Sequence, residues 1–166
     1  MQMRRRCLLA WLGLAGLTPT LVATPKPARA VPRGALRIHG PRAARELVLD
    51  DGTLAALGVE GLTTRTPWTE GVARFGGVPL AKVLRAVGVV DGSIRAIALN
   101  DYAVEFPAVD ALAMDAFLAR TMDGRELTVR DKGPFWMIFP WSARPELETA
   151  SVQAMSVWQL RELELR

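Results

Sequence analysis

The chain has 166 residues, of which 50% are hydrophobic, and a formal net charge of +4. This length suits one domain with a hydrophobic core and is too short for two ordinary domains. Five of the 21 basic residues lie within positions 1–30, and the rest of the chain has 16 basic and 17 acidic groups, a net charge of −1. A nucleic-acid-binding function is therefore disfavoured, because such proteins carry an excess of positive charge.

Positions 1–30 have the pattern of a cleavable export signal. Three arginines at positions 4–6 precede an apolar run from Leu8 to Leu17, and Ala28-Arg29-Ala30 offers a cleavage site. The run is shorter than the roughly twenty residues that span a bilayer. The arginines fit either a general secretory signal or a twin-arginine signal. We expect a periplasmic or secreted protein with no transmembrane span after cleavage and a single domain over residues 31–166.

The only cysteine is Cys7, which lies inside the expected signal. Cleavage after Ala30 removes it. The mature chain would then contain no disulfide, no thiolate metal ligand and no cysteine nucleophile.

The first part of the domain is expected to contain two short strands and a short helix. Alternating runs at Ala35–His39 and Arg45–Leu49 predict the strands. Asp51 is expected to cap a helix over Thr53–Leu57, which ends at Gly58.

The next segment contains the clearest helix. Glu60–Pro67 is rich in threonine and Val72–Phe75 is apolar, so both favour strands. Gly76-Gly77 permits either a tight turn or a close backbone approach. From Pro79 to Val87 the apolar residues follow the spacing of one helix face, with proline in the first turn.

The second half is expected to be mostly β. The turn pairs Asn100-Asp101 and Asp123-Gly124 predict two hairpins. The expected strands are 94–99, 102–106, 116–121, 126–129 and a final strand at 156–165, with helical turns at 110–114 and 145–150.

The most informative stretch is Pro134–Pro140. It has no charged residue, is rich in aromatic side chains and is bounded by prolines, which predicts a strand buried on both faces. Phe135, Trp136 and Phe139 would supply large apolar area to the core. Because a neighbour must cover each face, we predict an α+β fold with a mixed sheet packed around this strand.

Three motifs occur in an order that resembles the sulfite oxidase-like molybdopterin-binding domain family. They are Phe75–Leu80 (FGGVPL), Asn100-Asp101-Tyr102 and Gly133–Pro140, and a late tryptophan precedes the final strand. The resemblance covers Ala35–Arg166. It implies a mixed, barrel-like β-sheet with few short helices. In the enzymatic members it also implies a molybdenum-pterin cofactor that serves oxygen-atom or electron transfer.

The chain departs from the enzymatic members where they hold the cofactor. Those members bind molybdenum through a cysteine thiolate on the segment before the GVPL helix, but Leu62–Trp68 contains threonines and no cysteine. A hydroxyl oxygen cannot replace a soft thiolate. Trp136 stands where those members usually have an arginine, and Ser142–Pro145 stands where they have a glycine and a lysine. The tryptophan indicates that a charged pocket has become apolar or has been filled.

The candidate ligand-binding residues lie on three segments. The hydroxyls and the guanidinium of Thr63–Trp68 could hold an oxyanion, although threonine also simply favours strands. Tyr102 either presents its hydroxyl to the same cleft or packs as a ring, and Trp141 is the expected rim aromatic. The candidate set is Thr64, Arg65, Thr66, Trp68, Asn100, Tyr102, Trp141 and Arg144.

We therefore expect an exported, degenerate and non-catalytic molybdopterin-domain protein. It would bind a small ligand, or a periplasmic or membrane partner protein, between Thr63–Trp68 and Trp141. No metal ligand and no cofactor is expected, since molybdopterin is implied by the resemblance alone. Two alternatives stay open: an oxidoreductase that holds molybdopterin without a cysteine ligand, and a structural accessory subunit with an exposed apolar patch. His39, the only histidine, is expected to be structural or at the surface.

Overall fold

The computed structural model describes residues 32–166, so the expected export signal and the boundary at residue 30 lie outside the described residues. The strands are β1 (Leu36–His39), β2 (Leu47–Leu49), β3 (Glu60–Arg65), β4 (Val72–Pro79), β5 (Ser93–Ala98), β6 (Ala103–Pro107), β7 (Phe117–Met122), β8 (Arg125–Glu126), β9 (Trp136–Ile138) and β10 (Leu160–Leu165). The helices are α1 (Asp51–Leu57), α2 (Leu80–Ala86), α3 (Ala108–Ala113) and α4 (Ala150–Met155), with 3-10 turns η1 (Val129–Asp131) and η2 (Pro145–Leu147).

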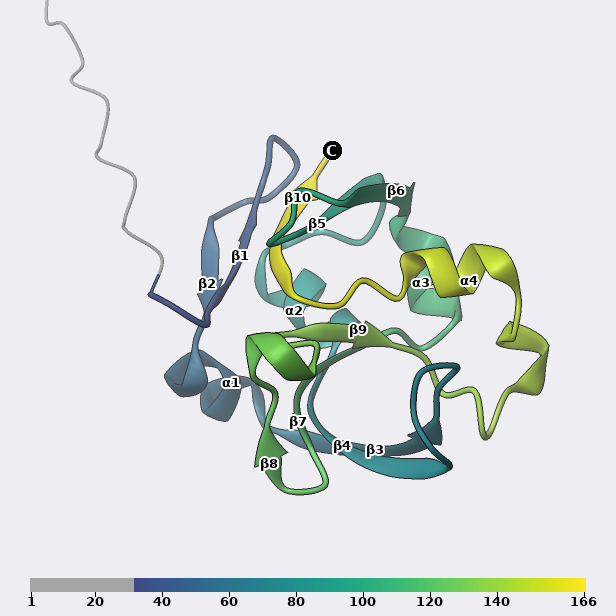
Figure 1. The fold of residues 1–166 in the computed structure, drawn as a ribbon. Coiled ribbons are helices and arrows are strands. Elements are labelled where there is room, and N and C mark those ends of the chain that lie inside the picture. The colour runs from purple at the N-terminus through teal and green to yellow at the C-terminus, as the bar shows by residue number, and fades with distance from the viewer. Residues whose placement is uncertain (1–31) are drawn as a thin grey trace, which may run out of the picture.

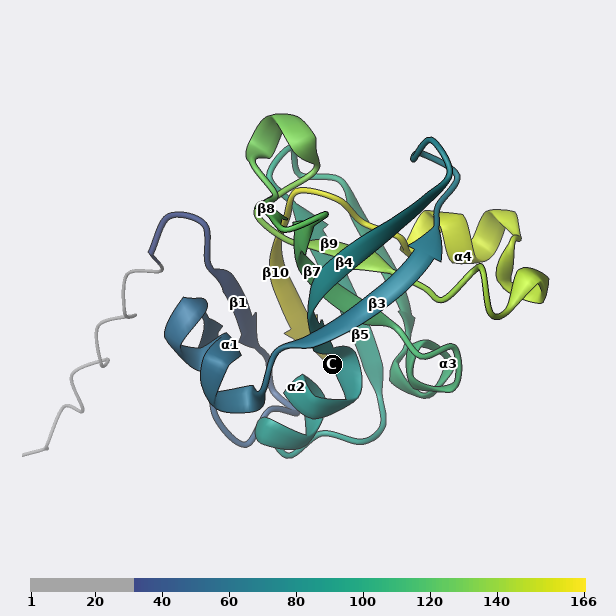
Figure 2. The same ribbon diagram turned by 90° about the horizontal axis from the view of Figure 1, so that it is seen from below.

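The strands form two sheets (Figure 1). One has the order β2-β1-β10-β5-β6, and the other has the order β3-β4-β7-β8 with β9 also paired to β7. Strands β1 and β10 are parallel, whereas the other pairs in the two sheets are antiparallel. Figure 2 shows the hairpin of β3 and β4 lying across one side of the molecule. The predicted α+β class with mixed strand directions is confirmed.

Strand β9 lies between the two sheets. On one side it pairs with β7, with Leu118 opposite Met137. On the other side Met137 N donates to Val157 O (2.9 Å) and Leu160 N donates to Phe135 O (2.9 Å), which ties β9 to the segment that enters β10. The residues from Phe135 to Phe139 have no exposed surface. The predicted strand buried on both faces is confirmed.

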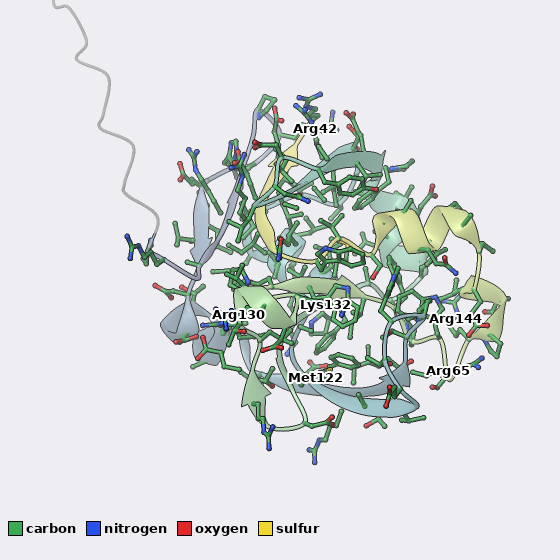
Figure 3. The ribbon with its side chains drawn as sticks, viewed as in Figure 1. Arg42, Arg65, Met122, Arg130, Lys132 and Arg144 are labelled. Atoms are coloured by element: carbon green, nitrogen blue, oxygen red, sulfur yellow. The ribbon has the colours of Figure 1, made fainter. Side chains whose placement is uncertain are left out.

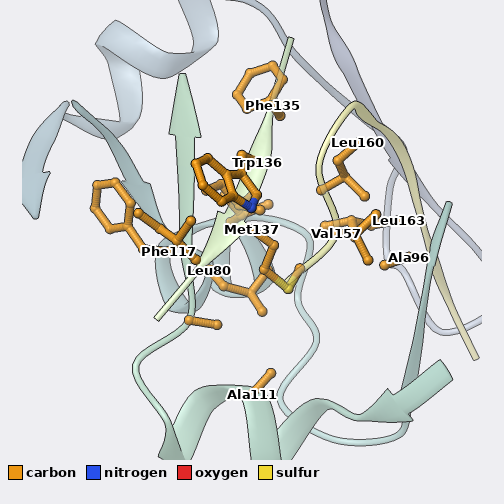
Figure 4. Packing of buried hydrophobic residues seen from close by; sticks show 14 of the residues in the cluster. Leu80, Ala96, Ala111, Phe117, Phe135, Trp136, Met137, Val157, Leu160 and Leu163 are labelled. Carbon is orange, nitrogen blue, oxygen red and sulfur yellow. The ribbon is translucent and has the colours of Figure 1, made fainter. Parts of the chain in front are cut away.

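The core packs on both sides of this strand. Figure 4 shows Trp136 and Met137 between a group that includes Phe117 and a second group that includes Val157 and Leu160. Large apolar side chains on both faces exclude water from the strand, and its backbone groups are bonded to the two neighbours.

Gly76 and Gly77 allow β4 to approach β7 closely. The register shifts between these two glycines, which marks a β-bulge. A Cβ atom added at Gly77 would lie 2.0 Å from Leu118 O, and one at Gly76 would lie 2.5 Å from the Thr121 hydroxyl oxygen. Of the two alternatives for this pair, the close backbone approach is therefore the one that occurs.

Two helix starts differ from the prediction, since α1 begins at Asp51, two residues before the predicted Thr53, and α2 begins at Leu80, one residue after Pro79. Asp50, rather than Asp51, is the N-cap of α1, because its Oδ1 accepts from Thr53 N at 2.8 Å. Asp51 is the first helical residue, where its charge suits the helix dipole. Pro79 ends β4 and is the N-cap residue of α2, so it precedes the first turn.

The connections around β8 and β10 contain larger differences. The predicted strand 126–129 is wrong, because β8 ends at Glu126 and the chain then turns into η1. The predicted strand from residue 156 begins only at Leu160, and α4 precedes it. Thr149 caps α4 by accepting from Val152 N (3.3 Å), and Val152 and Met155 are buried one turn apart. This cap starts α4 just after the predicted helical turn at 145–150, in a segment for which the sequence pattern predicted no strand.

Replacing Gly77 by alanine is expected to destabilise the fold strongly. The added Cβ would meet the Leu118 carbonyl, which belongs to the backbone of β7 and cannot move aside alone. We expect a loss of about 3 kcal/mol in the free energy of unfolding, measured by urea denaturation. Gly61→Ala is the matched control, because its added Cβ would meet its nearest atoms at 3.8 Å. Equal effects of the two substitutions would contradict the close-approach explanation.

Candidate functional site

The segment that carries the candidate threonines is bonded directly to the chain after β9. The Thr64 hydroxyl oxygen accepts from Ser142 N (3.0 Å) and donates to Arg65 O (3.0 Å). Arg65 N in turn donates to the Ser142 hydroxyl oxygen at 2.8 Å. Thr64 has no exposed surface. We call this set the Thr64–Ser142 contact, and it closes the cleft that was expected between the two segments.

The two candidate arginines form ion pairs on the outside of this contact (Figure 3). Arg65 pairs with Glu148 at 2.7 Å, and both side chains are substantially exposed. Arg144 pairs with Glu146 (3.0 Å) and Asp115 (3.2 Å) and also donates to the Ala113 carbonyl. These carboxylates neutralise the guanidinium charges, so neither arginine faces a free anion site.

The Arg144 pairs also affect the acidity of their partners. The hydrogen bond from Arg144 holds the pKa of Glu146 below its usual value. The same hydrogen bond raises the pKa of Arg144. Both groups are at the surface, where water screens the interaction.

Thr66 orders the turn between β3 and β4. Its hydroxyl oxygen accepts from Trp68 N (3.2 Å), and its backbone N–H donates to the Thr69 hydroxyl oxygen (3.0 Å). The turn places the Trp68 ring against other tryptophans. The hydrogen bonds of Thr66 therefore fix the position of Trp68 in this turn.

Trp141 is part of the core, so its expected role as a rim aromatic is wrong. It has no exposed surface, and its indole N–H donates to Leu147 O at 3.0 Å. Leu147 lies in η2, which the sequence pattern did not connect to this ring. A satisfied indole N–H removes the main cost of burying a tryptophan.

Trp136 fills the position at which an arginine was expected from the resemblance. Its ring is fully buried, its N–H donates to the Ser156 hydroxyl oxygen (3.1 Å), and Ser156 donates onward to Met137 O (2.7 Å). The Lys132 amine lies 5.4 Å from the ring centroid. Of the two alternatives at this position, an apolar pocket or a filled one, the space is filled.

A pocket of about 290 Å³ lies beside this aromatic cluster. It is enclosed by the Trp68 turn, the connection between β5 and β6, α4, and the segment between α4 and β10. We call it the aromatic pocket, and its lining residues are Trp68, Ala98, Asn100, Tyr102, Gln153, Ala154, Ser156, Val157 and Trp158.

Three of the candidate residues meet in the aromatic pocket, namely Trp68, Asn100 and Tyr102. The other five lie outside its lining. Sequence reasoning missed Trp158 and Gln153. Trp158 carried no distinguishing signal, because a tryptophan beside a polar residue was also the pattern that predicted a rim position for Trp141. Gln153 carried none, because helix α4 was not predicted.

His39 takes part in the join between β1 and β10. Its Nε2 contacts the Glu162 carboxylate, and both side chains are partly buried. This contact fits the expected structural role. Among residues 32–166, no group of three or more histidine, cysteine, aspartate or glutamate side chains is arranged to hold a metal ion. Within the same range, no helix is long and apolar enough to cross a membrane.

The two-sheet α+β fold and its buried strand define a domain of the molybdopterin-binding type. The model of the family described as "Oxidoreductase molybdopterin binding domain" matches residues 52–144. The chain therefore belongs to the oxidoreductase molybdopterin-binding domain family, and the resemblance to sulfite oxidase-like domains is confirmed.

Structure comparison gives the same fold. The chain is similar to a solved structure of the sulfane dehydrogenase SoxCD from Paracoccus pantotrophus, with a TM-score of 0.56 and 18% sequence identity over 79% of this chain. It spans 37% of the length of that solved chain. At this level of identity the similarity shows the fold alone. No curated protein sequence matches the chain.

The residues of this chain do not fit a molybdenum cofactor held through a thiolate. Residues 32–166 contain no cysteine, since Cys7 is the only one in the sequence. On the segment where a ligand would be expected, the hydroxyl of Thr64 already bonds to Ser142 N and Arg65 O. We therefore derive no reaction step through this cofactor.

Replacing Thr64 by valine is expected to weaken the fold, because valine keeps the shape but leaves Ser142 N–H without its acceptor. We expect a loss of about 1 to 2 kcal/mol in the free energy of unfolding, measured by urea denaturation. Thr63→Val is the control on the same strand, where the side chain is exposed. A neutral effect at Thr64 would mean that the contact does not hold the two segments together.

Proposed function

We propose that this protein is an exported, non-catalytic member of its family that binds a small molecule in the aromatic pocket. The observation that carries the proposal is the pocket itself, which has three aromatic side chains and no charged side chain in its lining. A pocket that is mostly apolar with a few polar groups is typical of a small-molecule site. The Thr64–Ser142 contact supports the non-catalytic part, since it occupies the segment that would offer a metal ligand.

A partner protein is a second candidate occupant of the same face. Leu99, Tyr102 and Trp158 are large apolar residues that are 42%, 48% and 37% exposed. Tyr102 and Trp158 line the pocket, and Leu99 N donates to the carbonyl of Gln159, the residue after Trp158. Aromatic residues at a pocket mouth are enriched in protein interfaces.

The non-catalytic proposal predicts that the isolated protein carries no stoichiometric molybdenum. Protein purified from the periplasm of a molybdate-fed host is expected to contain well below one molybdenum and one pterin per chain. Elemental analysis and the fluorescence of oxidised pterin measure the two contents. A family member with a cysteine ligand, purified in parallel, is the positive control. Stoichiometric molybdenum in this protein would overturn the proposal and favour an oxidoreductase without a cysteine ligand.

The export proposal rests on the sequence pattern of positions 1–30. Expression of the full chain is expected to give a periplasmic protein whose N-terminus is Val31, as read by N-terminal sequencing after cell fractionation. A chain that begins with Met followed by Val31 is the control and is expected to stay in the cytoplasm. Full-length protein found uncleaved in the cytoplasm would contradict export.

A further inference from the structure

We infer that the aromatic pocket binds an uncharged, planar heteroaromatic ring that has hydrogen-bond donors and acceptors on one edge, the chemical class of the nucleobases. This inference rests on the proposed function, because it names the ligand class of the same site. It follows from the walls of the pocket, its free polar groups, its lack of charge and its size.

Two tryptophans form a corner of the pocket. The rings of Trp68 and Trp158 are 5.3 Å apart between centroids and nearly perpendicular, at 81°. The Trp68 ring also makes edge contacts with the buried rings of Trp136 and Trp141, at centroid distances of 6.0 Å and 6.2 Å, which hold it in place. Trp158 is 37% exposed, and Tyr102 lines the same space. A flat ring can therefore stack on one aromatic side chain while its edge meets another.

Two carboxamides supply polar groups suited to the edge of such a ring. Asn100 Oδ1 accepts from Tyr102 N (3.1 Å), and the Asn100 amide nitrogen has no partner among the described residues. Within residues 32–166 the Gln153 side chain forms no hydrogen bond. Each carboxamide offers both donors and an acceptor, which is the pattern that pairs with the edge of an adenine. The other polar side chains of the lining already have partners, since Ser156 bonds to Trp136 and Met137 O, and Tyr102 donates to Ala154 O.

The lack of charge in the lining selects an uncharged ligand. A phosphate or carboxylate would find no arginine or lysine in the lining, and a cation would find no carboxylate. Asp101 lies next to two lining residues, but Arg161 neutralises it through an ion pair of 2.8 Å. Burying an unpaired charge costs much free energy. A neutral heterocycle has no charge to bury, so only the donors and acceptors on its edge need hydrogen-bond partners.

The rim of the pocket is held in shape before a ligand arrives. Asp101 and Gln159 adopt left-handed backbone conformations, with φ angles of 65° and 52°. Gln159 is fixed by three hydrogen bonds, from its N–H to Lys132 O, from its side chain to Val129 O, and from Leu99 N–H to its carbonyl. Such conformations persist only where neighbouring contacts impose them, and they cluster at binding sites. A rim of this kind lowers the entropy cost of binding.

The volume limits the ligand to about one ring system. The pocket holds about 290 Å³. This value lies just below the roughly 300 to 1,000 Å³ found for ligand pockets. A bicyclic heterocycle therefore fits the pocket better than a ligand with a long or phosphorylated tail.

The test uses adenine as the probe and the protein isolated from the periplasm. Titration is followed by the indole N–H signals of Trp68 and Trp158 in a nitrogen-15 NMR spectrum. We expect saturable shifts of these two signals and smaller shifts for the buried Trp141. Gln153→Leu keeps the side-chain volume but removes the carboxamide, and is expected to weaken adenine binding about tenfold. Val90→Ala is the matched control, since it shortens an exposed apolar side chain (72% exposed) outside the pocket lining and should change the affinity by about twofold or less.

Two further probes separate this ligand class from its alternatives. Indole is planar but its edge carries a single N–H donor and no acceptor, so it should bind about tenfold more weakly than adenine, and Gln153→Leu should weaken it less than it weakens adenine. Tetramethylammonium should not bind. If tetramethylammonium bound more tightly than adenine, the inference would be overturned in favour of a cation site. If indole bound as tightly as adenine, the inference would also be overturned, because the pocket would then recognise apolar surface alone.

The outcomes distinguish this inference from the proposed function. Absence of adenine binding to a protein with a dispersed NMR spectrum and no molybdenum would overturn the ligand class alone. Stoichiometric molybdenum would overturn the proposed function whether or not adenine binds. Adenine binding that Trp158→Ala leaves unchanged would place the ligand elsewhere and would overturn the inference as well.

Discussion

The structure depends on the backbone hydrogen bonds of β9 to both of its neighbours. Strand β7 bonds to one edge, and the segment before β10 bonds to the other. Because β7 belongs to one sheet and β10 to the other, β9 fixes how the two sheets face each other. The prolines that bound the buried stretch cannot donate a hydrogen bond, so the strand stays short. Its buried side chains on both faces then form the centre of the core (Figure 4).

The aromatic pocket is continuous with this core. Trp136 of β9 contacts Trp68, and Trp68 contacts the half-exposed Trp158 at the pocket. A continuous series of edge-to-face aromatic contacts therefore connects the buried strand β9 with the protein surface at the pocket. Trp68 packs against the core and also lines the proposed binding pocket, whereas Trp158 and Gln153 line the pocket without belonging to the buried core. The buried part of the cluster gives the exposed part a fixed orientation, and that is the physical basis of a preorganised site.

This chain keeps the fold of its family, but the segment on which a metal ligand was expected contains no cysteine. The fold is that of the molybdopterin-binding domain family, but the position expected for a metal ligand carries a threonine whose hydroxyl bonds to the protein backbone. A fold can be kept by core packing while its site changes, because the two depend on different residues. In this structure Trp136 is buried, the Thr64 hydroxyl bonds to Ser142 N, and a pocket without charged lining residues lies beside the aromatic cluster.

The sequence by itself determined the features that depend on local pattern. The uncharged run between prolines predicted β9, the paired glycines limited that position to a tight turn or a close approach, and the ordered motifs predicted the family. The tertiary structure alone decided which side chains meet. The sequence pattern predicted a rim position for Trp141, but η2 covers it and bonds to its indole, whereas Trp158, which was not among the candidates, is 37% exposed. The physical reason is that the burial of a side chain is set by segments distant in the chain. No local period could therefore place Trp68, Tyr102 and Gln153 around one pocket.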